Sequence, residues 1–534
     1  MITEPDVDPA VVVAGDALID LTPTTTVRGH LAYEPHPGGS CFNVAVGLGR
    51  LGVPVAFLAR LSTDAFGQML RTQLADSGVQ PTYFVDTDDL TTLAAVHLRG
   101  GGLPTYSFHA QRTADRGLLP EHLRPLPGGA ALHVGSIALM LEPVASTLEV
   151  LLRREAGRRV VSLDPNVRPG LIQDRVAYVD RFEGWMRLVD ILKVSQEDLA
   201  WLYPRLSEDE VIAVWHAAGV PLAFVTHGEH GAVASTPSGS TTVEAPRVTV
   251  VDTVGAGDAF TSGALAHLYA QGQLSRDALQ SLDTAALREL VKVACAIAAD
   301  TCTRAGADPP RRRDLGARPL GASREVTLGL SDLVGRARAL AVPGQRHLLG
   351  ITGAPGAGKT KVAKAIVDKL GPDLVAFVPM DGFHLSNHTL IAWGRRDRKG
   401  AWDTFDVDGY VDLLRRLLHQ EEEIVHAPDF DRDVDEPIGS ALPIRREVPL
   451  VVTEGNYLLS DIGGWAGVAP LLDESWYLEL ADAIRLEPLT SRHQLHGMSH
   501  EQADVLARTT DQDNAVLIAE SMPRADLVIR MFGS

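Results

Sequence analysis

Short apolar runs rich in valine, leucine and isoleucine alternate with amphipathic stretches along the whole chain. They include VVVAG near residue 11, VAFLARL near 55, VVSLDPN near 160, LAFVTHG near 222, LLGITG near 348 and PLVVTEG near 449. A short apolar run suits a buried strand, and the amphipathic stretch that follows suits a helix lying on the sheet. The alternation predicts an α/β architecture with mostly parallel strands.

The chain is long enough for more than one domain, since a domain usually takes about 100 to 200 residues and this sequence has 534. The clearest break in composition is ADPPRRRDLGARPLGASR, residues 307–324, where proline, glycine and arginine cluster without apolar periodicity. The following SDLVGRARALA has Ser331 in position to cap a helix. We predict a first domain over residues 1–312, a linker over 313–330 and a second domain over 331–534.

Composition and charge limit the partners that the chain can bind. A net charge of −19 disfavours contact with a nucleic-acid backbone, which needs clustered lysine and arginine. A small phosphorylated ligand needs only a few backbone N–H groups and one or two cations. The expected partners are small-molecule substrates, with no nucleic acid.

Cysteine usage and the distribution of apolar residues indicate the cytoplasm. The three cysteines, Cys41, Cys295 and Cys302, have neither the number for a disulfide framework nor the spacing of a zinc site. The first residues are acidic where a secretion signal is basic. No stretch reaches the roughly 18 uncharged apolar residues of a membrane span, so no membrane association is expected.

The stretch GITGAPGAGKTK, in the last third of the chain, predicts a nucleotide site. Gly353, Gly358, Lys359 and Thr360 complete G-x-x-x-x-G-K-[ST] between strand-like HLLGI and helix-like KVAKAIVDKL. These glycines and Gly356 let backbone N–H groups converge on phosphate oxygens at a helix N-terminus. Lys359 would neutralise the β and γ phosphates of ATP, and the Thr360 hydroxyl would bind Mg²⁺.

Two carboxylates follow strand-like runs downstream of this loop. Asp381, in VPMDGFHL, could accept a proton from a substrate hydroxyl. Glu454, in VVTEGNYLL, could hold Mg²⁺ or its water, directly or through Asp381. Each alone could equally be a helix cap or a loop carboxylate. The phosphate loop by itself does not separate a kinase from an ATPase.

On the motifs GAPGAGKT, MDGFH, RKGAWDTFD and TEGNYLL, the second domain resembles the P-loop kinases of the uridine kinase, phosphoribulokinase and bacterial pantothenate kinase group. The resemblance implies a P-loop NTPase fold with a doubly wound parallel sheet. It also implies transfer of the ATP γ-phosphoryl group to a small-molecule hydroxyl, with Asp381 as the base.

The same resemblance suggests a lid and an acceptor region. IRLEPLTSRHQLHG is similar to the family's lid and would bring Arg485 and Arg492 to the nucleotide phosphates, although arginines on an exposed helix are often merely solvated. RRDRKGAWDTFD makes Lys399, Asp403 and Asp406 candidate acceptor contacts, and the alternative is a charged surface loop. The acceptor stays open between a nucleoside, pantothenate and a sugar.

A second glycine-rich turn, VDTVGAGDAFTSG, precedes an apolar helix in the first domain and contains no lysine. Backbone N–H groups of Gly255, Ala256 and Gly257 would form an anion hole for a transferring phosphoryl group. Asp258 is placed to deprotonate the attacking hydroxyl. Taken alone, the turn could also be a helix start with a capping aspartate.

Two signatures, GGSCFNVAVGLGRLG and DTVGAGDAFTSGAL, make the first domain resemble the ribokinase-like, PfkB-type carbohydrate kinases. Between and around them stand GDALID, DPNVRPGL, KVSQEDL, VTHGEHGA and TCTRAGADPP in the family's order. The resemblance implies a three-layer α/β sandwich with a small β lid, and ATP with Mg²⁺. Its functional positions fall on sugar-binding Asp20, Gly39, Asn43 and Arg168, on nucleotide-bordering Thr226, Gly228 and Gly231, and on the base Asp258.

Some positions depart from the family pattern or have two interpretations. Ser40 stands where ribokinases carry a lysine, which argues against ribose, and GDALIDLTP and TCTRAGADPP look most like fructokinases. Ser195 and Asp198 replace an asparagine and a glutamate of many relatives, which leaves the Mg²⁺ network there less certain. Asp252 would hold K⁺, as in potassium-activated members, or would bond to its own backbone.

Residues 16–40 and 90–112 are expected to form the sugar lid, which in the family often pairs between subunits and so suggests a homodimer. Together the two resemblances predict a bifunctional ATP-dependent kinase. The first domain would phosphorylate fructose or a related ketose or keto-sugar acid, and the second a small-molecule hydroxyl. The alternatives are that the P-loop domain binds ATP only as a regulator, or that it is an ATPase coupled to a partner.

Overall fold

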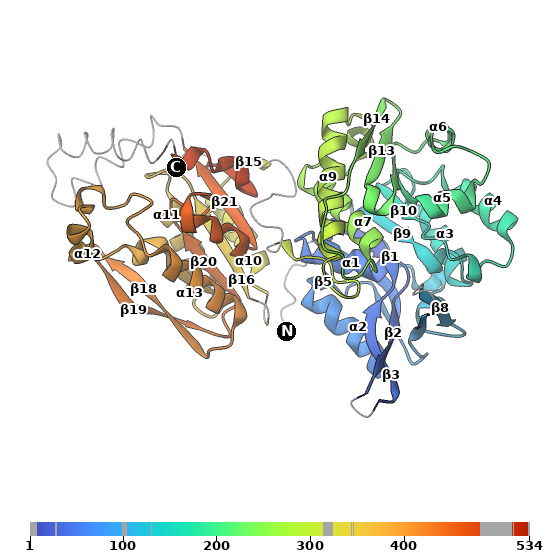
Figure 1. The fold of residues 1–534 in the computed structure, drawn as a ribbon, viewed down its shortest axis with the longest axis horizontal. Coiled ribbons are helices and arrows are strands. Elements are labelled where there is room, and N and C mark those ends of the chain that lie inside the picture. The colour runs from blue at the N-terminus through green and yellow to red at the C-terminus, as the bar shows by residue number, and fades with distance from the viewer. Residues whose placement is uncertain are drawn as a thin grey trace. The chain divides into compact units, whose positions relative to one another are not determined.

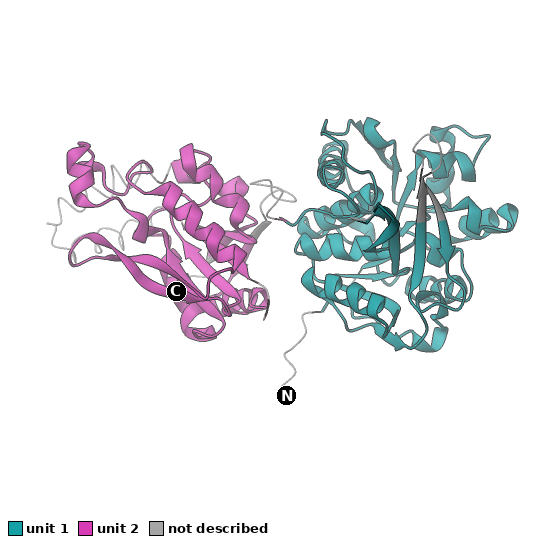
Figure 2. Cartoon of the chain, turned by 60° about the horizontal axis from the view of Figure 1, so that its bottom comes forward, with its two compact units in different colours: residues 1–311 teal, residues 312–534 magenta. Residues whose placement is uncertain are grey.

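The computed structural model describes residues 8–26, 29–98, 104–129, 131–312, 324–342, 344, 346–480, 515 and 517–531. The chain forms two compact units, Met1–Arg311 and Arg312–Ser534 (Figure 2). The division falls beside the predicted boundary at residue 312. Each unit has its own main sheet.

A ten-stranded sheet forms the centre of the first unit within its described residues, in the order β14-β13-β12-β11-β10-β9-β1-β4-β5 with β6 beside β4. The strands are β1 (Val11–Ala14), β4 (Val55–Ser62), β5 (Val79–Gln80), β6 (Phe84–Thr87), β9 (Ala131–Gly135), β10 (Val161–Asp164), β11 (Ile191–Ser195), β12 (Leu222–Thr226), β13 (Ala232–Thr236) and β14 (Gly239–Val243). The pairings of this sheet are parallel except those that β13 makes with β12 and with β14. The inner strands β1 and β9 are buried along their whole length because helices cover both of their faces.

Helices form the outer two layers of this unit (Figure 1). On one face lie α1 (Ser40–Arg50), α7 (Ala256–Ala270) and α9 (Thr284–Thr301), and on the other lie α3 (Val144–Glu155), α4 (Arg175–Trp185), α5 (Gln196–Leu202) and α6 (Glu208–Ala218). The remaining helices of the unit are α2 (Ala65–Asp76) and α8 (Arg276–Gln280). α7 is buried along most of its length because it packs against both α1 and α9.

A separate four-stranded sheet, in the order β3-β2-β7-β8, lies within the two segments predicted to form a lid. Its strands are β2 (Leu18–Thr25), β3 (Leu31–Gly38), β7 (Thr92–Leu98) and β8 (Pro104–His109). β2 pairs antiparallel with β3 and parallel with β7. Short connections join the small sheet to the rest of the unit. β2 begins four residues after β1 of the main sheet ends, and β3 ends two residues before α1 begins.

The second unit is built on a parallel sheet of six strands in its described part, in the order β15-β22-β21-β16-β20-β17. They are β15 (Arg324–Leu328), β16 (His347–Thr352), β17 (Val375–Pro379), β20 (Leu450–Glu454), β21 (Glu474–Glu479) and β22 (Leu527–Met531). Its named helices in the described part are α10 (Leu330–Leu340), α11 (Lys359–Leu370), α12 (Asn387–Ala392) and α13 (Val407–His419), and a hairpin consists of β18 (Ile424–Asp431) and β19 (Glu436–Arg445).

Both faces of this second sheet are packed. Leu333 of α10 and Ile366 of α11 lie in one apolar core with Ile351. Leu414 of α13 lies in the other core with Val451, whose side chain points to the opposite face from its neighbours in β20. Strands covered on both faces need continuous apolar sequence, which is what HLLGIT and LVVTE supply.

The predicted linker of residues 313–330 is wrong in its second half. Arg324–Leu328 form β15 and pair in parallel with β22. Val326 and Leu328 pack against the apolar core, and this alternation was hidden by the proline, glycine and arginine that precede it. The helix predicted from Ser331 begins at Leu330, with Gly329 as its N-cap. Residues 313–323 lie outside the described residues.

No helix in the described ranges combines the length and the apolar character needed to cross a lipid bilayer.

Candidate active site

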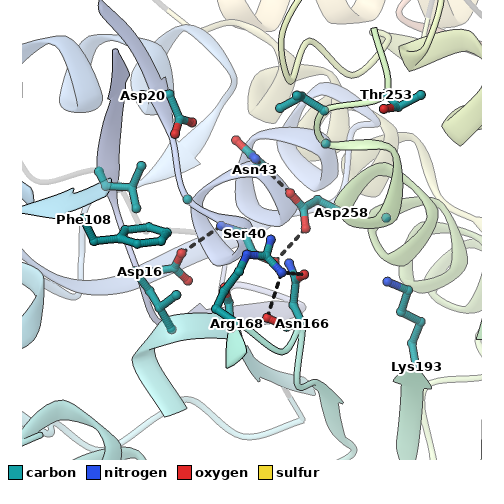
Figure 3. A pocket seen from close by; sticks show the side chains of 17 residues that line it. Asp16, Asp20, Ser40, Asn43, Phe108, Asn166, Arg168, Lys193, Thr253 and Asp258 are labelled. Carbon is teal, nitrogen blue, oxygen red and sulfur yellow. Dashed lines mark hydrogen bonds between the residues drawn. The ribbon is translucent and has the colours of Figure 1, made fainter. Parts of the chain in front are cut away.

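A cavity of about 320 Å³ in the first unit gathers side chains from both of its sheets (Figure 3). Its walls come from β2 and β8 of the small sheet, from the starts of α1 and α7, and from the carboxyl ends of β9, β10 and β11. They are lined by Asp16, Leu18, Asp20, Gly39, Ser40, Asn43, Phe108, Ser136, Ile137, Asn166, Arg168, Lys193, Thr253, Val254, Gly255, Gly257 and Asp258. Open α/β sheets commonly bind ligands at the carboxyl ends of their strands.

The start of α1 is fixed by Asp16. Its carboxylate accepts hydrogen bonds from the backbone N–H groups of Ser40 at 2.9 Å and Cys41 at 3.3 Å. Gly39 has a φ of 107°, and a Cβ there would lie 2.9 Å from the Asp16 carbonyl oxygen, so only glycine fits. Burial raises the pKa of Asp16 against these hydrogen bonds. Sequence reasoning missed Asp16, although it stands in GDALID beside the predicted Asp20.

Asp258 lies in the first turn of α7 and is bound on both carboxylate oxygens. Ser40 Oγ donates to Oδ1 at 2.6 Å and Asn43 Nδ2 donates to Oδ2 at 2.8 Å (Figure 3). Burial raises the pKa of Asp258 to about 7, and the hydrogen bonds from Ser40 and Asn43 oppose that rise. A carboxylate that titrates near neutral pH is suited to take a proton from a hydroxyl.

The predicted anion hole is the N-terminus of α7, a helix of 15 residues. Gly255 is its N-cap with a φ of 78°, in the left-handed region that favours glycine. The N–H of Ala256 donates to Thr253 O at 3.3 Å. A Cβ on Gly257 would lie 2.9 Å from Lys193 Nζ. The helix start therefore combines the positive end of a helix dipole with a nearby ammonium group.

Lys193 is the cation that sequence reasoning missed. It rises from β11 toward the start of α7 (Figure 3), and its Nζ lies 2.9 Å from Asp164 Oδ2. Burial disfavours its charged form, but the carboxylates of Asp164, Asp258 and Asp198 outweigh burial and raise its pKa. A lysine inside the otherwise apolar run ILKVS was the available signal, because such a lysine must have a buried partner.

Asp20 and Arg168, two of the predicted sugar-binding residues, also line the cavity. Asp20 reaches it from β2, with Phe108 of β8 beside it. Burial and repulsion by Asp16 raise the pKa of Asp20 to about 6, against the attraction of Arg168. The guanidinium of Arg168 is oriented by hydrogen bonds to Asn166 Oδ1 at 2.6 Å and to Asn166 O at 3.1 Å. Asp20, Gly39, Asn43 and Arg168 are thus brought together around one space.

The predicted nucleotide-bordering residues lie outside the walls of this cavity. Thr226 ends β12 and pairs with Ser195 of β11, and Gly228 and Gly231 form the turn into β13. Asp252 accepts backbone N–H groups on both oxygens, from Val254 at 3.0 Å and Gly306 at 2.8 Å. These contacts with backbone N–H groups agree with the second interpretation of Asp252, in which the carboxylate bonds to the backbone.

In the second unit, the glycine-rich loop runs from the end of β16 to the start of α11. Gly353, Gly356 and Gly358 have φ angles of 143°, 84° and 89°. Lys359 Nζ donates to Gly353 O at 2.8 Å and to Asn456 Oδ1 at 2.7 Å. Its ammonium group therefore lies inside the curve of the loop.

Three predicted side chains meet beside this loop. Thr360 Oγ1 donates to Glu454 Oε1 at 3.0 Å. Burial and repulsion by Asp381 raise the pKa of Glu454, against the attraction of Lys359. Asp381 follows β17 in a short turn, Met380–Phe383, and pairs through Oδ2 with Arg432 Nη2 of the hairpin at 3.2 Å.

The predicted acceptor residues of this unit make local contacts. Lys399 Nζ bonds to Asn387 Oδ1 at 2.9 Å and lies 3.1 Å from Asp435 Oδ2. Asp403 pairs with Arg398 at 2.5 Å, and Asp406 caps the N-terminus of α13. Arg485 and Arg492 lie outside the described residues. Among the residues that the structure describes, no group of three histidine, cysteine or acidic side chains is arranged to hold a metal.

Comparisons with known proteins concern the first unit. Residues 8–313 match the model of the pfkB family carbohydrate kinases. A fructokinase of Rhizobium leguminosarum bv. trifolii is 39% identical over 319 residues, covering 60% of this chain and 92% of the relative. A fructokinase of Klebsiella pneumoniae is 40% identical over 267 residues, covering 49% of this chain and 84% of the relative.

Solved structures agree. A fructokinase from Xylella fastidiosa with bound ATP is 29% identical with a TM-score of 0.51, covering 56% of this chain and 93% of that one. A fructokinase double mutant from Vibrio cholerae O395, in a form with fructose, ADP and potassium ion bound, is 30% identical with a TM-score of 0.50, covering 56% of this chain and 95% of that one.

The ribokinase-like α/β fold and the similarity to fructokinases predicted for the first unit are confirmed. This unit is a carbohydrate kinase, which transfers phosphate to an alcohol group. Through residues 8–313, the chain belongs to the pfkB family of carbohydrate kinases.

Proposed function

We propose that the first unit phosphorylates fructose or a closely related ketose or keto-sugar acid, with ATP as the phosphate donor. The observation that carries the proposal is Asp258, a buried carboxylate of pKa about 7 at a helix N-terminus, facing a cavity walled by Asp20 and Arg168. The fructose, ADP and ATP in the related fructokinase structures support both substrates.

In the proposed reaction, Asn43, Asp20 and Gly39 orient the sugar with one hydroxyl near Asp258. As that oxygen forms its bond to the γ-phosphorus, its proton passes to Asp258, the bond to the β,γ-bridging oxygen breaks, and ADP leaves. The start of α7 and Lys193 stabilise the negative charge on the transferring group. Mg²⁺, when bound with ATP, would neutralise charge on the phosphate groups.

A potassium ion near Asp252 is a separate proposal. The related Vibrio cholerae structure was solved with potassium ion bound, which supports it. The two backbone N–H groups already on the Asp252 carboxylate support the loop-bonding alternative.

The acceptor is tested by an ADP-release assay of the full chain with fructose, other hexoses and ketoses, keto-sugar acids, ribose and pantothenate. The proposal expects fructose or a related ketose or keto-sugar acid to give the highest kcat/KM, and phosphorus NMR of the product to show a phosphate monoester. If only ribose were phosphorylated, the preference inferred from Ser40 and the fructokinase relatives would be wrong.

We propose that the second unit is also a kinase, acting on the hydroxyl of a nucleoside, pantothenate or a sugar-like molecule. The loop around Lys359 supports a site for a nucleoside triphosphate. Asp381, beside the loop, is the carboxylate that would act as the base. The Thr360 hydroxyl and the Glu454 carboxylate, 3.0 Å apart, are oxygen ligands of the kind Mg²⁺ prefers, so they fit that metal and would hold it. When bound, it would neutralise charge on the phosphates.

Two alternatives to a second kinase are a regulatory ATP site and an ATPase coupled to a partner. Acidic Asp381 and Glu454 together favour the kinase, because a site that only binds ATP does not need a base. The ADP-release assay decides between these three functions. An acceptor whose phosphorylation depends on Asp381 supports the kinase. ATP hydrolysis that needs no acceptor supports the ATPase, and ATP binding with neither activity supports the regulator.

The proposed partners are small molecules in the cytoplasm, and the proposed assembly is a homodimer through the small sheet. β3 is an edge strand of that sheet, with Leu31 71% exposed and Tyr33 40% exposed. An open, partly apolar edge favours pairing with another strand. Light scattering of the wild type and of Leu31→Glu tests this: the proposal expects a dimer that the substitution weakens, and a wild-type monomer would contradict it.

A further inference from the structure

Arg50 is the last residue of α1, at the opposite end of that helix from Ser40. Its Nη1 donates to Asp308 Oδ1 at 2.5 Å and to Pro309 O at 2.7 Å, and its Nε donates to Ser77 Oγ at 3.4 Å. The Arg50 side chain is only 14% exposed. A guanidinium that bonds a carboxylate and a carbonyl of the same turn holds that turn from two directions.

The turn that Arg50 holds belongs to residues 302–309, here called the bracing segment. Cys302 O accepts the N–H of Val251 at 2.8 Å and that of Asp252 at 3.3 Å. Gly306 N–H donates to Asp252 Oδ2 at 2.8 Å. The bracing segment therefore accepts or donates hydrogen bonds along Val251 and Asp252, which lead directly into α7.

The same segment also packs against the start of α7. A Cβ built on Gly255 would lie 2.6 Å from Ala307 Cβ and 2.9 Å from Ala307 Cα. Gly255, the N-cap of α7, and Ala307 of the bracing segment are therefore packed too closely for a side chain to fit between them. A shift of Ala307 would therefore displace Gly255, and with it the first turn that contains Asp258.

α1 thus meets the phosphoryl-transfer site twice. At its beginning, Ser40 and Asn43 bind the Asp258 carboxylate directly. At its end, Arg50 reaches the same helix turn through Asp308 and Ala307. The two ties fix both the side chain and the backbone of the turn relative to one rigid helix.

We propose that Arg50 is a positioning residue for phosphoryl transfer, holding the bracing segment so that Gly255 keeps the N-terminus of α7 in its catalytic position. The proposal rests on the role proposed above for the start of α7 and Asp258. It predicts that loss of the Arg50–Asp308 pair lowers kcat and leaves the affinity for sugar largely intact, since Asp20 stands in β2 and Arg168 follows β10, outside the bracing segment.

Asp308 is the better site for the test than Arg50. Its side chain is 45% exposed and lines a second cavity of about 630 Å³, so Asp308→Asn opens no new void, and the Arg50 guanidinium keeps its bond to Pro309 O. Arg50→Gln and Arg50→Lys complete the series. Arg60→Gln is the matched control, because Arg60 makes a similar 2.5 Å pair with Asp89 away from the bracing segment.

The experiment is steady-state kinetics of fructose phosphorylation by the full chain, with Tm measured for each variant. We expect kcat to fall about tenfold or more in Asp308→Asn and Arg50→Gln, since misplacement of reacting groups by about 1 Å can cost up to about 100-fold, with KM for fructose within about twofold. The double variant should be no slower than Arg50→Gln alone, Arg50→Lys should recover most of kcat, and Arg60→Gln should match the wild type.

The proposal is overturned if Asp308→Asn keeps kcat within about twofold of the wild type, or if the losses of the two single variants multiply in the double variant. A lowered Tm with unchanged kcat would show a structural role alone. Asp258→Asn separates this result from failure of the proposed function: if it stays active, the role of the α7 start is wrong, whatever Arg50 does.

Discussion

Ser40 Oγ donates a hydrogen bond of 2.6 Å to Asp258 Oδ1, across 218 residues of sequence. The bond joins the first turn of α1 to the first turn of α7, and a second bond from Asn43 completes the pair. Burial raises the pKa of Asp258, and the bond from Ser40 lowers it, because a donor favours the charged carboxylate. The hydroxyl of Ser40 therefore helps to decide how much of Asp258 is ionised at neutral pH.

Ser40→Ala should move the acidic limb of the kcat profile for fructose phosphorylation to higher pH. Without the donor, the pKa of Asp258 rises further above about 7, so less of the base is ionised at pH 7. A shift of about one pH unit would lower kcat at pH 7 roughly fivefold or more, and the loss should shrink at pH 9. Ser281→Ala is the control, since its hydroxyl binds only Ala278 O on the surface. A uniform loss at every pH would contradict the prediction.

Asp258→Asn should stabilise the first unit more at pH 8 than at pH 5. The folded pKa of Asp258 is raised from its ordinary 3.8 to about 7, so the folded state holds a proton that the unfolded state releases. Stability is therefore lost as pH rises from about 4 to 7, and asparagine removes that loss. A gain of about 1 kcal/mol would raise Tm by about 2 to 4 °C. Scanning calorimetry at both pH values checks this, and a gain that is equal at the two values would refute it.

Lys193→Met should destabilise the first unit, because Asp164 would be left buried without its 2.9 Å partner. Breaking one side of a buried ion pair typically costs about 3 to 5 kcal/mol. The double variant Lys193→Met with Asp164→Asn should recover part of that loss, since neither side then leaves a buried charge. Calorimetric Tm values of the wild type, Lys193→Met and the double variant test the pair. A double variant less stable than Lys193→Met would contradict this account.

Lys359→Ala should halve the number of nucleotides bound per chain, from two to one. The ammonium group of Lys359 lies inside the glycine-rich loop, where it would neutralise phosphate oxygens. Titration calorimetry with a non-hydrolysable ATP analogue and Mg²⁺ measures the stoichiometry. Lys361→Ala is the matched control, since Lys361 is exposed on the same helix turn. One nucleotide per wild-type chain would rule out two competent sites.

The sequence pattern predicted much of the fold and most of the sugar side of the cavity. The positions of the strands followed from short apolar runs. A parallel strand that is buried on both faces shows a continuous apolar run, because neither of its faces is exposed to water. Asp20, Asn43, Arg168 and Asp258 were found because each stands in a motif whose neighbours, glycines above all, are constrained by backbone geometry. Those residues do converge on one space in the structure.

What could not be predicted depends on partners that are distant in sequence. Lys193 and Asp164 lie 29 residues apart, and only the parallel pairing of β10 with β11 brings them together. β15 was missed because its five residues gain their stability from β22, about 200 residues later. Asp406, predicted as an acceptor contact from its charge, has its carboxylate on the N-terminus of α13, a local contact that charge alone does not predict.

The most direct test of the central claim is fructose-dependent ADP release by the full chain with Asp258→Asn, measured beside the wild type and Lys359→Ala. Removing the base should lower kcat by about 100- to 10,000-fold, while Lys359→Ala should keep the wild-type rate with fructose. Full activity in Asp258→Asn, or loss of fructose phosphorylation in Lys359→Ala, would contradict the assignment of this chemistry to the first unit.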